Sequence, residues 1–254
     1  MRRIIAIALN TYREAVRNRI FYLLVGFGFF FALSSRFISM VTVGDQARVL
    51  KDVGLGAIHF FSITLVIFTG INLIYQEIER RTLFNILSKP VSRSEFILGK
   101  FFGLALTAGL SLLAMAGVFL LFLTITTGRV ETPLLLSFLL LYEELLIITA
   151  LALLFSSFTT PILSFLFTVS LTLIGRVLWT YNEFRPLLRT PLVRGLCRAI
   201  YLLLPNLDKF NIQDAVVVGR PLSTPTVLLA MGYGAVYIIA LLTLTLFLFR
   251  RRQF

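Results

Sequence analysis

Charged residues are scarce in this chain. They make up 14% of its 254 residues, while hydrophobic residues make up 58%, and soluble domains carry about 25% charged residues. A chain of this composition has too little polar surface to cover a soluble globule. It therefore predicts an integral membrane protein, with no room for a soluble enzymatic domain beside the membrane part.

Cysteine and histidine are almost absent. The single Cys197 excludes an internal disulfide, and the single His59 excludes a histidine-rich metal site. An intramembrane serine or metal enzyme would need a constellation that one histidine cannot supply, so we expect His59 to be structural. The chain also lacks the Gly-x-x-x-x-Gly-Lys-Ser/Thr phosphate loop. We therefore expect no catalytic residue, no metal, no cofactor and no ATP site in this chain.

Acidic residues are half as frequent as basic ones. The chain has 24 lysines and arginines against 12 acidic residues, a formal net charge of +12. The basic residues are spread over separate islands, which disfavours nucleic-acid binding. Contact with anionic lipid and the excess of basic residues in cytoplasmic loops explain the imbalance better. Membrane lipid is thus an expected partner, and nucleic acid is not.

The chain contains several long apolar runs. A membrane-spanning helix needs about 20 predominantly apolar residues. The runs that meet this need lie at about 20–43, 53–76, 101–128, 134–156, 161–181 and 226–249, with the turn Ser156–Pro161 between the fourth and the fifth. The sequence therefore predicts an all-α polytopic membrane protein with six spans, forming one domain over residues 1–254.

Two further segments lie outside these runs. Residues 1–19 place Ile5, Leu9, Tyr12 and Val16 on one helical face, which is typical of an amphipathic helix lying at the membrane interface. The alternative is an extension of the first span. Residues 182–225 mix arginines, aromatics and prolines and are expected to form an external segment before the last span.

The orientation follows from the basic residues. With six spans both termini lie on one side, and that side also receives the charged island 77–100. Thirteen of the 24 basic residues fall there, and the bias holds in the short segments next to span ends, where the rule applies best. We therefore expect both termini and residues 77–100 to be cytoplasmic.

The island 77–100 carries the most specific pattern in the chain. It resembles the cytoplasmic loop of type-2 ABC transporter permeases, which runs roughly Glu-x-Glu-x-x-Thr-Leu-x-x-Leu-Leu-Ser-x-Pro-Val-Ser-Arg and then Gly-Lys. The matching residues are Glu77, Glu79, Thr82, Leu83, Leu87, Ser88, Pro90, Val91, Ser92, Arg93, Gly99 and Lys100. Arg81 stands where a glycine is common, and Ile86 replaces the first leucine of the pair. Residues 204–210, Leu-Pro-Asn-Leu-Asp-Lys-Phe, resemble an external-loop motif of the subset related to NosY, the maturation permease of nitrous oxide reductase.

The resemblance implies a fold and a function. The fold is that of a type-2 ABC exporter, and the permease would be half of a dimeric pore, paired with a second copy or a paralogue. A separate ABC ATPase subunit would bind and hydrolyse ATP, and the setting would be a plasma membrane, specifically a bacterial inner membrane. Residues 77–93 would form the coupling helix that contacts the ATPase, through Glu77, Glu79, Arg80, Arg81, Thr82, Leu83, Phe84, Pro90 and Arg93.

Glu143 and Glu144 are a pair of charges inside the fourth span. At about 1.5 Å rise per residue they would lie near the middle of the membrane, where a charge is costly. One hypothesis is that they line a polar translocation path or proton relay. The others are that they form a structural pair with an arginine such as Arg176, or that the span begins later and both lie near the interface.

A second functional class remains open on the sequence. An ion-coupled secondary transporter would work without an ATPase, and it would show internal repeats and broken helices with paired charges. Only the Glu143–Glu144 pair favours it. Copurification with an ATPase separates the two classes, whereas the transported substrate cannot be read from the sequence.

Overall fold

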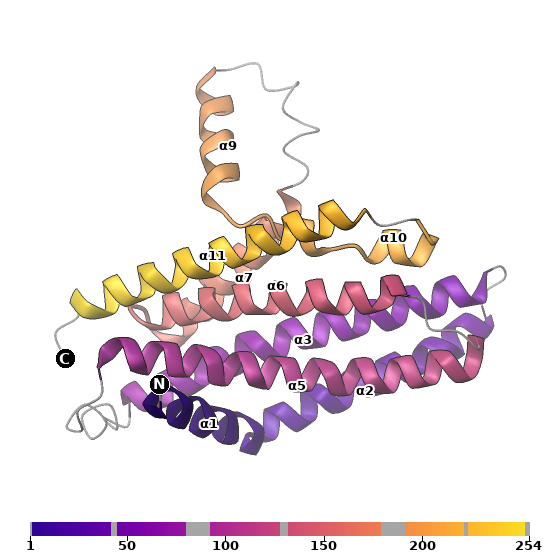
Figure 1. Cartoon of the computed structure of the whole chain (residues 1–254), viewed down its shortest axis with the longest axis horizontal. Helices are drawn as coiled ribbons and strands as arrows, with labels where there is room; N and C mark the ends of the chain where they lie inside the picture. Colours follow the sequence, from indigo (N-terminus) through magenta and orange to yellow (C-terminus); the bar gives the residue numbers. More distant parts are fainter. Residues whose placement is uncertain are drawn as a thin grey trace.

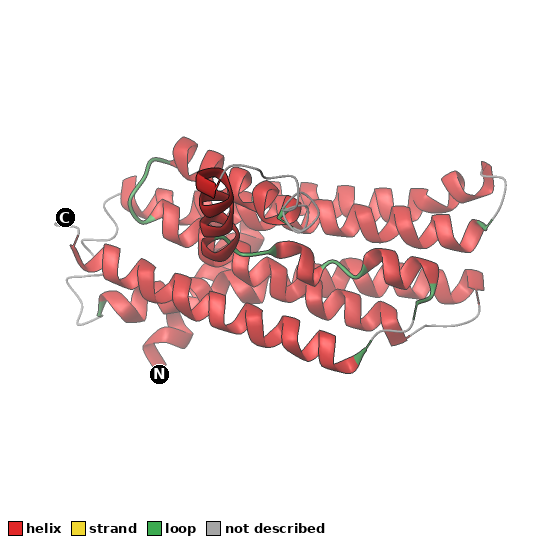
Figure 2. Ribbon diagram, turned by 90° about the horizontal axis from the view of Figure 1, so that it is seen from above, coloured by secondary structure: helices red, strands yellow, loops and turns green. Residues whose placement is uncertain are grey.

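The computed structural model describes residues 2–41, 45–79, 92–127, 132–178, 191–220 and 223–251, and every element in these ranges is helical (Figure 2). The elements are α1 (Arg2–Arg17), α2 (Arg19–Val41), α3 (Gln46–Glu79), α5 (Arg93–Thr127), α6 (Thr132–Ser156), α7 (Pro161–Val177), α9 (Pro191–Leu203), the 3₁₀ turn η2 (Leu207–Phe210), α10 (Gln213–Val218) and α11 (Thr224–Arg251). α6 ends and α7 begins at the turn that the sequence indicates.

The long helices form one bundle. α2, α3, α5, α6, α7 and α11 run along its length in alternating directions (Figure 1). Both ends of the chain lie at the same end of the bundle, together with the end of α3 and the start of α5 (Figure 1). We call this the terminal end; the start of α3 and the start of α6 lie at the opposite end.

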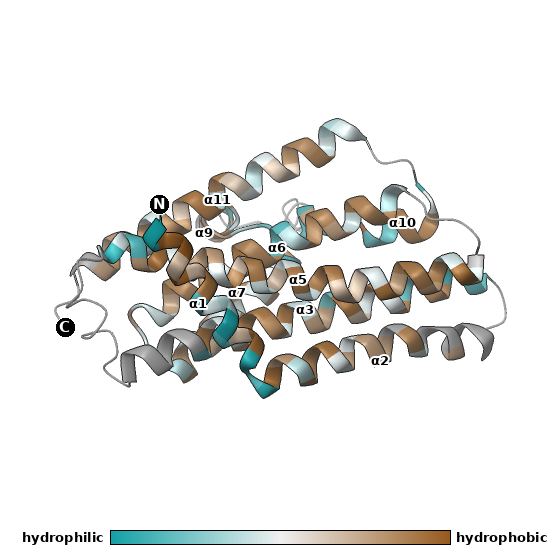
Figure 3. Ribbon diagram, turned by 60° about the horizontal axis from the view of Figure 1, so that its bottom comes forward, coloured by the Kyte–Doolittle hydropathy of each residue, from teal (hydrophilic) through white to brown (hydrophobic). Residues whose placement is uncertain are grey.

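Four of these helices are long and apolar enough to cross a membrane. The candidate spans are Gln46–Asn72, Arg93–Thr126, Thr132–Ser156 and Thr224–Phe249, and shorter apolar stretches occur at Arg19–Phe31 in α2 and Pro161–Val177 in α7. The outside of the bundle is apolar over most of its length (Figure 3), with Phe30 63% and Ile125 75% exposed. Large apolar side chains exposed over a whole bundle indicate contact with lipid. These features indicate a multi-pass membrane protein.

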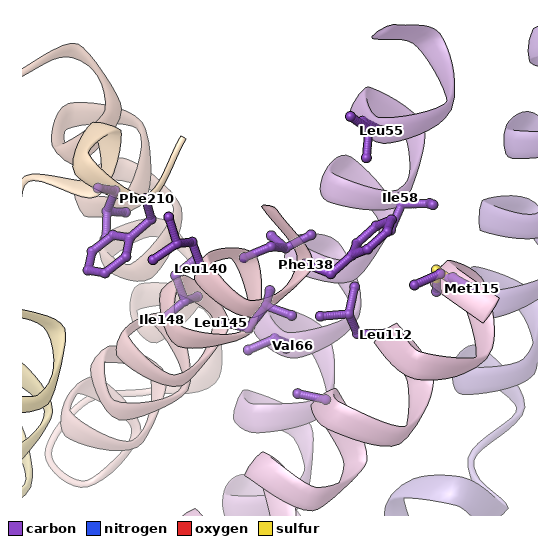
Figure 4. Packing of buried hydrophobic residues seen from close by; sticks show 14 of the residues in the cluster. Leu55, Ile58, Val66, Leu112, Met115, Phe138, Leu140, Leu145, Ile148 and Phe210 are labelled. Carbon is purple, nitrogen blue, oxygen red and sulfur yellow. The ribbon is translucent and has the colours of Figure 1, made fainter. Parts of the chain in front are cut away.

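α6 is the central helix of the bundle. In its most apolar stretch 72% of the residues are buried, against 17% in α11. Phe138 and Leu145 of α6 pack among side chains of α3 and α5, such as Ile58 and Leu112 (Figure 4). Glu144 is therefore buried within protein and Glu143 is partly buried, although both lie on an apolar helix.

α1 is a separate helix that packs against the start of α5. Asn18 separates it from α2. Gly99 and Gly103 of α5 leave room for it: a Cβ atom at Gly103 would lie 2.5 Å from Thr11 Cβ and 2.6 Å from Ala8 O. Small residues four apart allow two helices to approach closely. Ile5 and Leu9 are 58% and 43% exposed, so the apolar face noted in the sequence stays free for contact with lipid.

The segment after α7, which includes most of the predicted external segment 182–225, falls into two parts. α9 stands away from the bundle (Figure 1), but residues 205–218 pack into the bundle, with Leu207 0% and Phe210 2% exposed. These two side chains are three residues apart on a 3₁₀ turn and therefore share one face. They fill the space beside α7, which ends at Val177, where Gly175 lies against Leu207.

Tyrosines in the middle of α11 hold this segment in place. Tyr237 Oη donates to Leu202 O at 3.2 Å and to Leu204 O at 3.1 Å. Asn206 N donates to Tyr233 Oη at 2.8 Å. Because α11 runs from Thr224 to Arg251, α9 joins the bundle halfway along that helix.

Candidate functional site

The two helices on either side of the predicted coupling residues meet the terminal end of the bundle, where α3 ends and α5 begins. Glu77 and Glu79 are on the last turn of α3, and their side chains lie outside the described residues. Arg80, Arg81, Thr82, Leu83, Phe84 and Pro90 also lie outside them. The structure therefore defines how the chain enters and leaves the predicted coupling helix.

The chain that follows the predicted coupling helix starts α5 with a capping box. Ser92 N and Oγ donate to Glu95 Oε2 at 2.9 and 3.1 Å, and Glu95 N donates to Ser92 Oγ at 3.2 Å. A serine followed three residues later by a glutamate satisfies backbone groups at a helix start in this way. Arg93 Nη1 donates to Phe249 O of α11 at 3.2 Å. The start of α5 is thus fixed locally and tied to the end of α11.

α1 is joined to the same turns of α5 by charges. Lys100 Nζ lies 3.9 Å from Glu14 Oε2, and the Lys100 side chain is only 1% exposed. Arg3 and Glu95 lie 4.0 Å apart at the surface. A buried lysine needs a counter-charge, so Glu14 makes α1 part of the support of α5. A displacement of α5 at this end would be passed to α1 and α11.

A second group of polar residues lies inside the bundle. Arg176 Nη2 of α7 donates to Glu144 Oε1 of α6 at 2.7 Å. His59 Nε2 of α3 donates to Glu144 Oε2 at 2.9 Å, and Arg176 Nη2 also contacts the His59 ring. The side chains of Glu144, His59 and Arg176 are 1%, 14% and 28% exposed. We call these three residues the polar triad; it ties α3, α6 and α7 together.

The triad has a further neighbour in η2. Asp208 lies close enough to Arg176 and Glu144 for their charges to act on it. Arg176 therefore offsets negative charge from both α6 and η2. A buried carboxylate without such a partner would be costly, so we expect Arg176 to stabilise this region.

Two cavities meet at the triad. A groove of about 390 Å³ lies between α3 and α7. Its α3 wall runs from Gly56 past His59 to Phe68, and its α7 wall includes Phe165 and Arg176. A pocket of about 30 Å³, lined by Ser137, Glu144, Phe210 and Gln213, also has His59 in its wall. His59 thus lines both spaces.

Glu143 has a different environment from Glu144. It lies on the side of α6 that faces α11, and its Oε2 atom is buried without a hydrogen-bond partner among the described residues. A Cβ atom at Gly234 of α11 would lie 2.6 Å from Glu143 Oε1. The two adjacent glutamates therefore serve different interfaces, and only Glu144 belongs to the triad.

Gly234→Ala should displace the Glu143 side chain. We expect a loss in free energy of unfolding of about 1–3 kcal/mol, as is usual for overpacking. Gly232→Ala on the same helix is the control, because a Cβ atom there meets nothing within 4 Å. Thermal unfolding in detergent measures both. Adding Glu143→Ala should restore the Gly234→Ala protein, and equal effects of the two glycine substitutions would contradict this account.

The sequence alone pointed to only part of this site. Pairing of Glu144 with Arg176 was one of the alternatives left open, and it is present. No sequence pattern indicated that His59 joins the same group, because a single histidine in an apolar run has no partner nearby in the sequence. The contact between Ser92 and Glu95, by contrast, can be recognised from the sequence, since a capping box has a fixed spacing.

Comparison with known proteins supplies the family. No curated protein matches the chain. The family model described as ABC-2 family transporter protein matches residues 5–254. These residues include every helix of the bundle, the polar triad and the charged contacts at the start of α5. Together with the all-helical structure and its long apolar helices, this match shows that the chain belongs to the ABC-2 family of transporter proteins.

Proposed function

We propose that this chain is the membrane-spanning permease subunit of an ATP-driven exporter and that its 77–93 segment couples it to a separate ATPase subunit. Membership of the ABC-2 family makes it a permease component of an ABC transporter, which works in general with an ABC ATPase. In this proposal the ATPase binds and hydrolyses ATP, and this chain carries no catalytic residue and no cofactor. NosY-like membership rests only on residues 204–210.

The observation that carries the coupling proposal is the network at the start of α5. Arg93 is bonded to α11, and Lys100 is paired with α1. A push on the chain before Ser92 would therefore move three helices together. We place this terminal end in the cytoplasm of a plasma membrane, specifically a bacterial inner membrane, because most of the basic residues near span ends gather there.

Six spans are part of the proposal. α2 and α7 alternate in direction with the four long apolar helices (Figure 1), so each would cross the membrane as well. An even number of crossings agrees with both termini lying at one end of the bundle.

The position of α9 favours a dimer. It joins the bundle halfway along α11, and Arg198 on it is exposed. An exposed arginine at that depth is costly in lipid, so protein or a water-filled path would surround it. A second permease chain, either another copy or a paralogue, would supply that surface and enclose a translocation path between the two bundles.

Copurification tests the coupling proposal. Glu77→Lys combined with Glu79→Lys should lower the recovery of the ATPase at least about tenfold, because like charges facing each other across an interface cost several kcal/mol. Asp45→Lys is the control, since Asp45 is exposed and directly precedes α3, whose start lies at the opposite end of the bundle. Two differently tagged permease copies in the same preparation report on the homodimer.

The outcomes separate the possible functions. Recovery of the ATPase that is unaffected by the Glu77 and Glu79 substitutions would remove the coupling role of this segment. If no ATPase is ever recovered, the chain works without one, as an ion-coupled secondary transporter would. If the tagged copies do not associate but the ATPase is recovered, the second chain of the pore is a paralogue.

A further inference from the structure

Glu143 is a carboxylate without a counter-charge among the described residues. Its Oε2 atom is buried without a hydrogen-bond partner there, and its side chain lies against Gly234 of α11. Glu143 is only half-buried, so part of the residue remains accessible from outside the bundle. A carboxylate inside a membrane needs a cation or water beside it.

Arg198 on α9 is the opposite charge in the same situation. It is exposed, and no ion pair or hydrogen bond joins it to another described residue. The guanidinium group stays charged in proteins, so it cannot become neutral to enter lipid. Arg198 therefore needs an acceptor from outside the part of the chain that the structure describes.

α9 has two different faces. Val193, Ile200 and Leu203 are spaced by seven and three residues, which places them on one side of the helix. They are 41%, 42% and 80% exposed. Arg198 is two residues before Ile200 and so lies about 160° from it around the helix axis. Lipid can cover the apolar face, whereas the arginine face requires a polar partner.

Glu143 and Arg198 lie at nearly the same depth. α9 stands across the length of the bundle and is held at its end by Tyr237 of α11, whose Oη atom donates to two backbone carbonyl groups (Figure 1). Gly234, which Glu143 contacts, is three residues from Tyr237, or about 4.5 Å along α11. A two-fold axis along the bundle leaves the depth of every residue unchanged. In such a dimer, Arg198 of one copy is level with Glu143 of the other.

The distance to a neighbouring bundle also fits. Arg198 is one helical turn from Leu202, where α9 is held, so about 6 Å separates the two along the helix. The axes of packed helices lie about 8–10 Å apart. A second bundle packed against the first would therefore contact α9 near Arg198.

We infer that Arg198 of one copy forms an ion pair with Glu143 of a second copy of this chain. This inference rests on the proposed function, because it identifies the second chain of the dimer as a copy of the first. Two-fold symmetry forms the pair twice. Each pair supplies a counter-charge to one exposed arginine and one half-buried carboxylate. A charge pair across an interface also fixes the partner and the register.

Crosslinking tests the contact. Cys197→Ser removes the chain's single cysteine. Glu143→Cys is placed in a copy with one tag and Arg198→Cys in a copy with another, and membranes holding both are treated with a short bis-maleimide. A covalent dimer that carries both tags is expected. Arg220→Cys in place of Arg198→Cys is the control, since Arg220 is another exposed arginine of the segment 182–225, and it should give no such dimer.

Charge reversal tests the pairing. Arg198→Glu should lower the recovery of the doubly tagged dimer at least about tenfold, because two carboxylates then face each other across the interface. Adding Glu143→Gln removes one of these charges at nearly constant size and should restore most of the recovery. Arg220→Glu should leave the recovery near that of the parent. Thermal unfolding in detergent shows that each variant is folded.

Three results would overturn the inference. One is the absence of the covalent dimer while the unsubstituted tagged copies associate. Another is a loss with Arg198→Glu that Glu143→Gln does not restore, which would assign Arg198 to another acceptor, such as a lipid phosphate. The third is tagged copies that never associate, which would assign the second chain to a paralogue. Because these assays use no ATPase, they can fail while ATPase recruitment succeeds.

Discussion

Arg176→Gln is expected to lower the free energy of unfolding by about 3–5 kcal/mol, because removal of one member of a buried ion pair leaves the other charge without a partner. Glu144 is 1% exposed and cannot reach water in its place. The Arg176 side chain is itself 28% exposed toward the groove, so we expect the lower part of this range. Thermal unfolding of the purified protein in detergent measures the loss.

A second substitution, at Glu144, tests whether the loss of stability comes from this ion pair. Adding Glu144→Gln to Arg176→Gln should recover most of the lost stability, because two neutral amides can hydrogen-bond and no buried charge remains. Arg48→Gln is the matched control. Arg48 pairs with Asp45 at 3.8 Å, but both side chains are more than half exposed, so about 0–1 kcal/mol is expected. A double variant less stable than Arg176→Gln would show that Glu144 is stabilised by something other than this pair.

Gly103→Ala is expected to detach α1 from α5. The new Cβ atom would lie 2.6 Å from the backbone oxygen of Ala8 and 2.5 Å from Thr11 Cβ, and neither atom can move without moving α1. We expect a cost of about 1–3 kcal/mol, with α1 shifting to relieve the contact. The arginines of α1 should then be cleaved faster by trypsin, and ATP-driven transport should fall because α1 no longer supports α5.

Gly117→Ala on the same helix is the control. A Cβ atom at Gly117 meets nothing within 4 Å, so the substitution should be neutral or stabilising by up to about 1 kcal/mol through helix propensity. Equal trypsin sensitivity in the two variants would show that α1 does not depend on the close approach at Gly103. Unchanged transport with a released α1 would show that the helix is not needed for coupling.

The sequence was most informative where a property depends on neighbours along the chain. The lengths of the apolar runs and the turn Ser156–Pro161 follow from local composition, and the structure ends α6 and starts α7 there. The family was also readable, since residues 77–100 carry a pattern of closely spaced residues, and the ABC-2 match covers 5–254.

Tertiary structure decided the rest, because the partners are far apart in the sequence. His59, Glu144 and Arg176 are separated by 85 and 32 residues, and no spacing rule connects them. The packing of residues 205–218 into the bundle likewise depends on the end of α7 at Val177 and on the two tyrosines of α11.

The charged residues show most clearly which properties the sequence determines and which the tertiary structure determines. The sequence alone determined that this chain crosses a membrane, that it belongs with transporter permeases, and that residues 77–93 are the candidate for coupling. Only the folded bundle decided which charges meet inside it. A membrane interior makes every buried charge find a partner, but which partner it finds depends on the helices packed beside it.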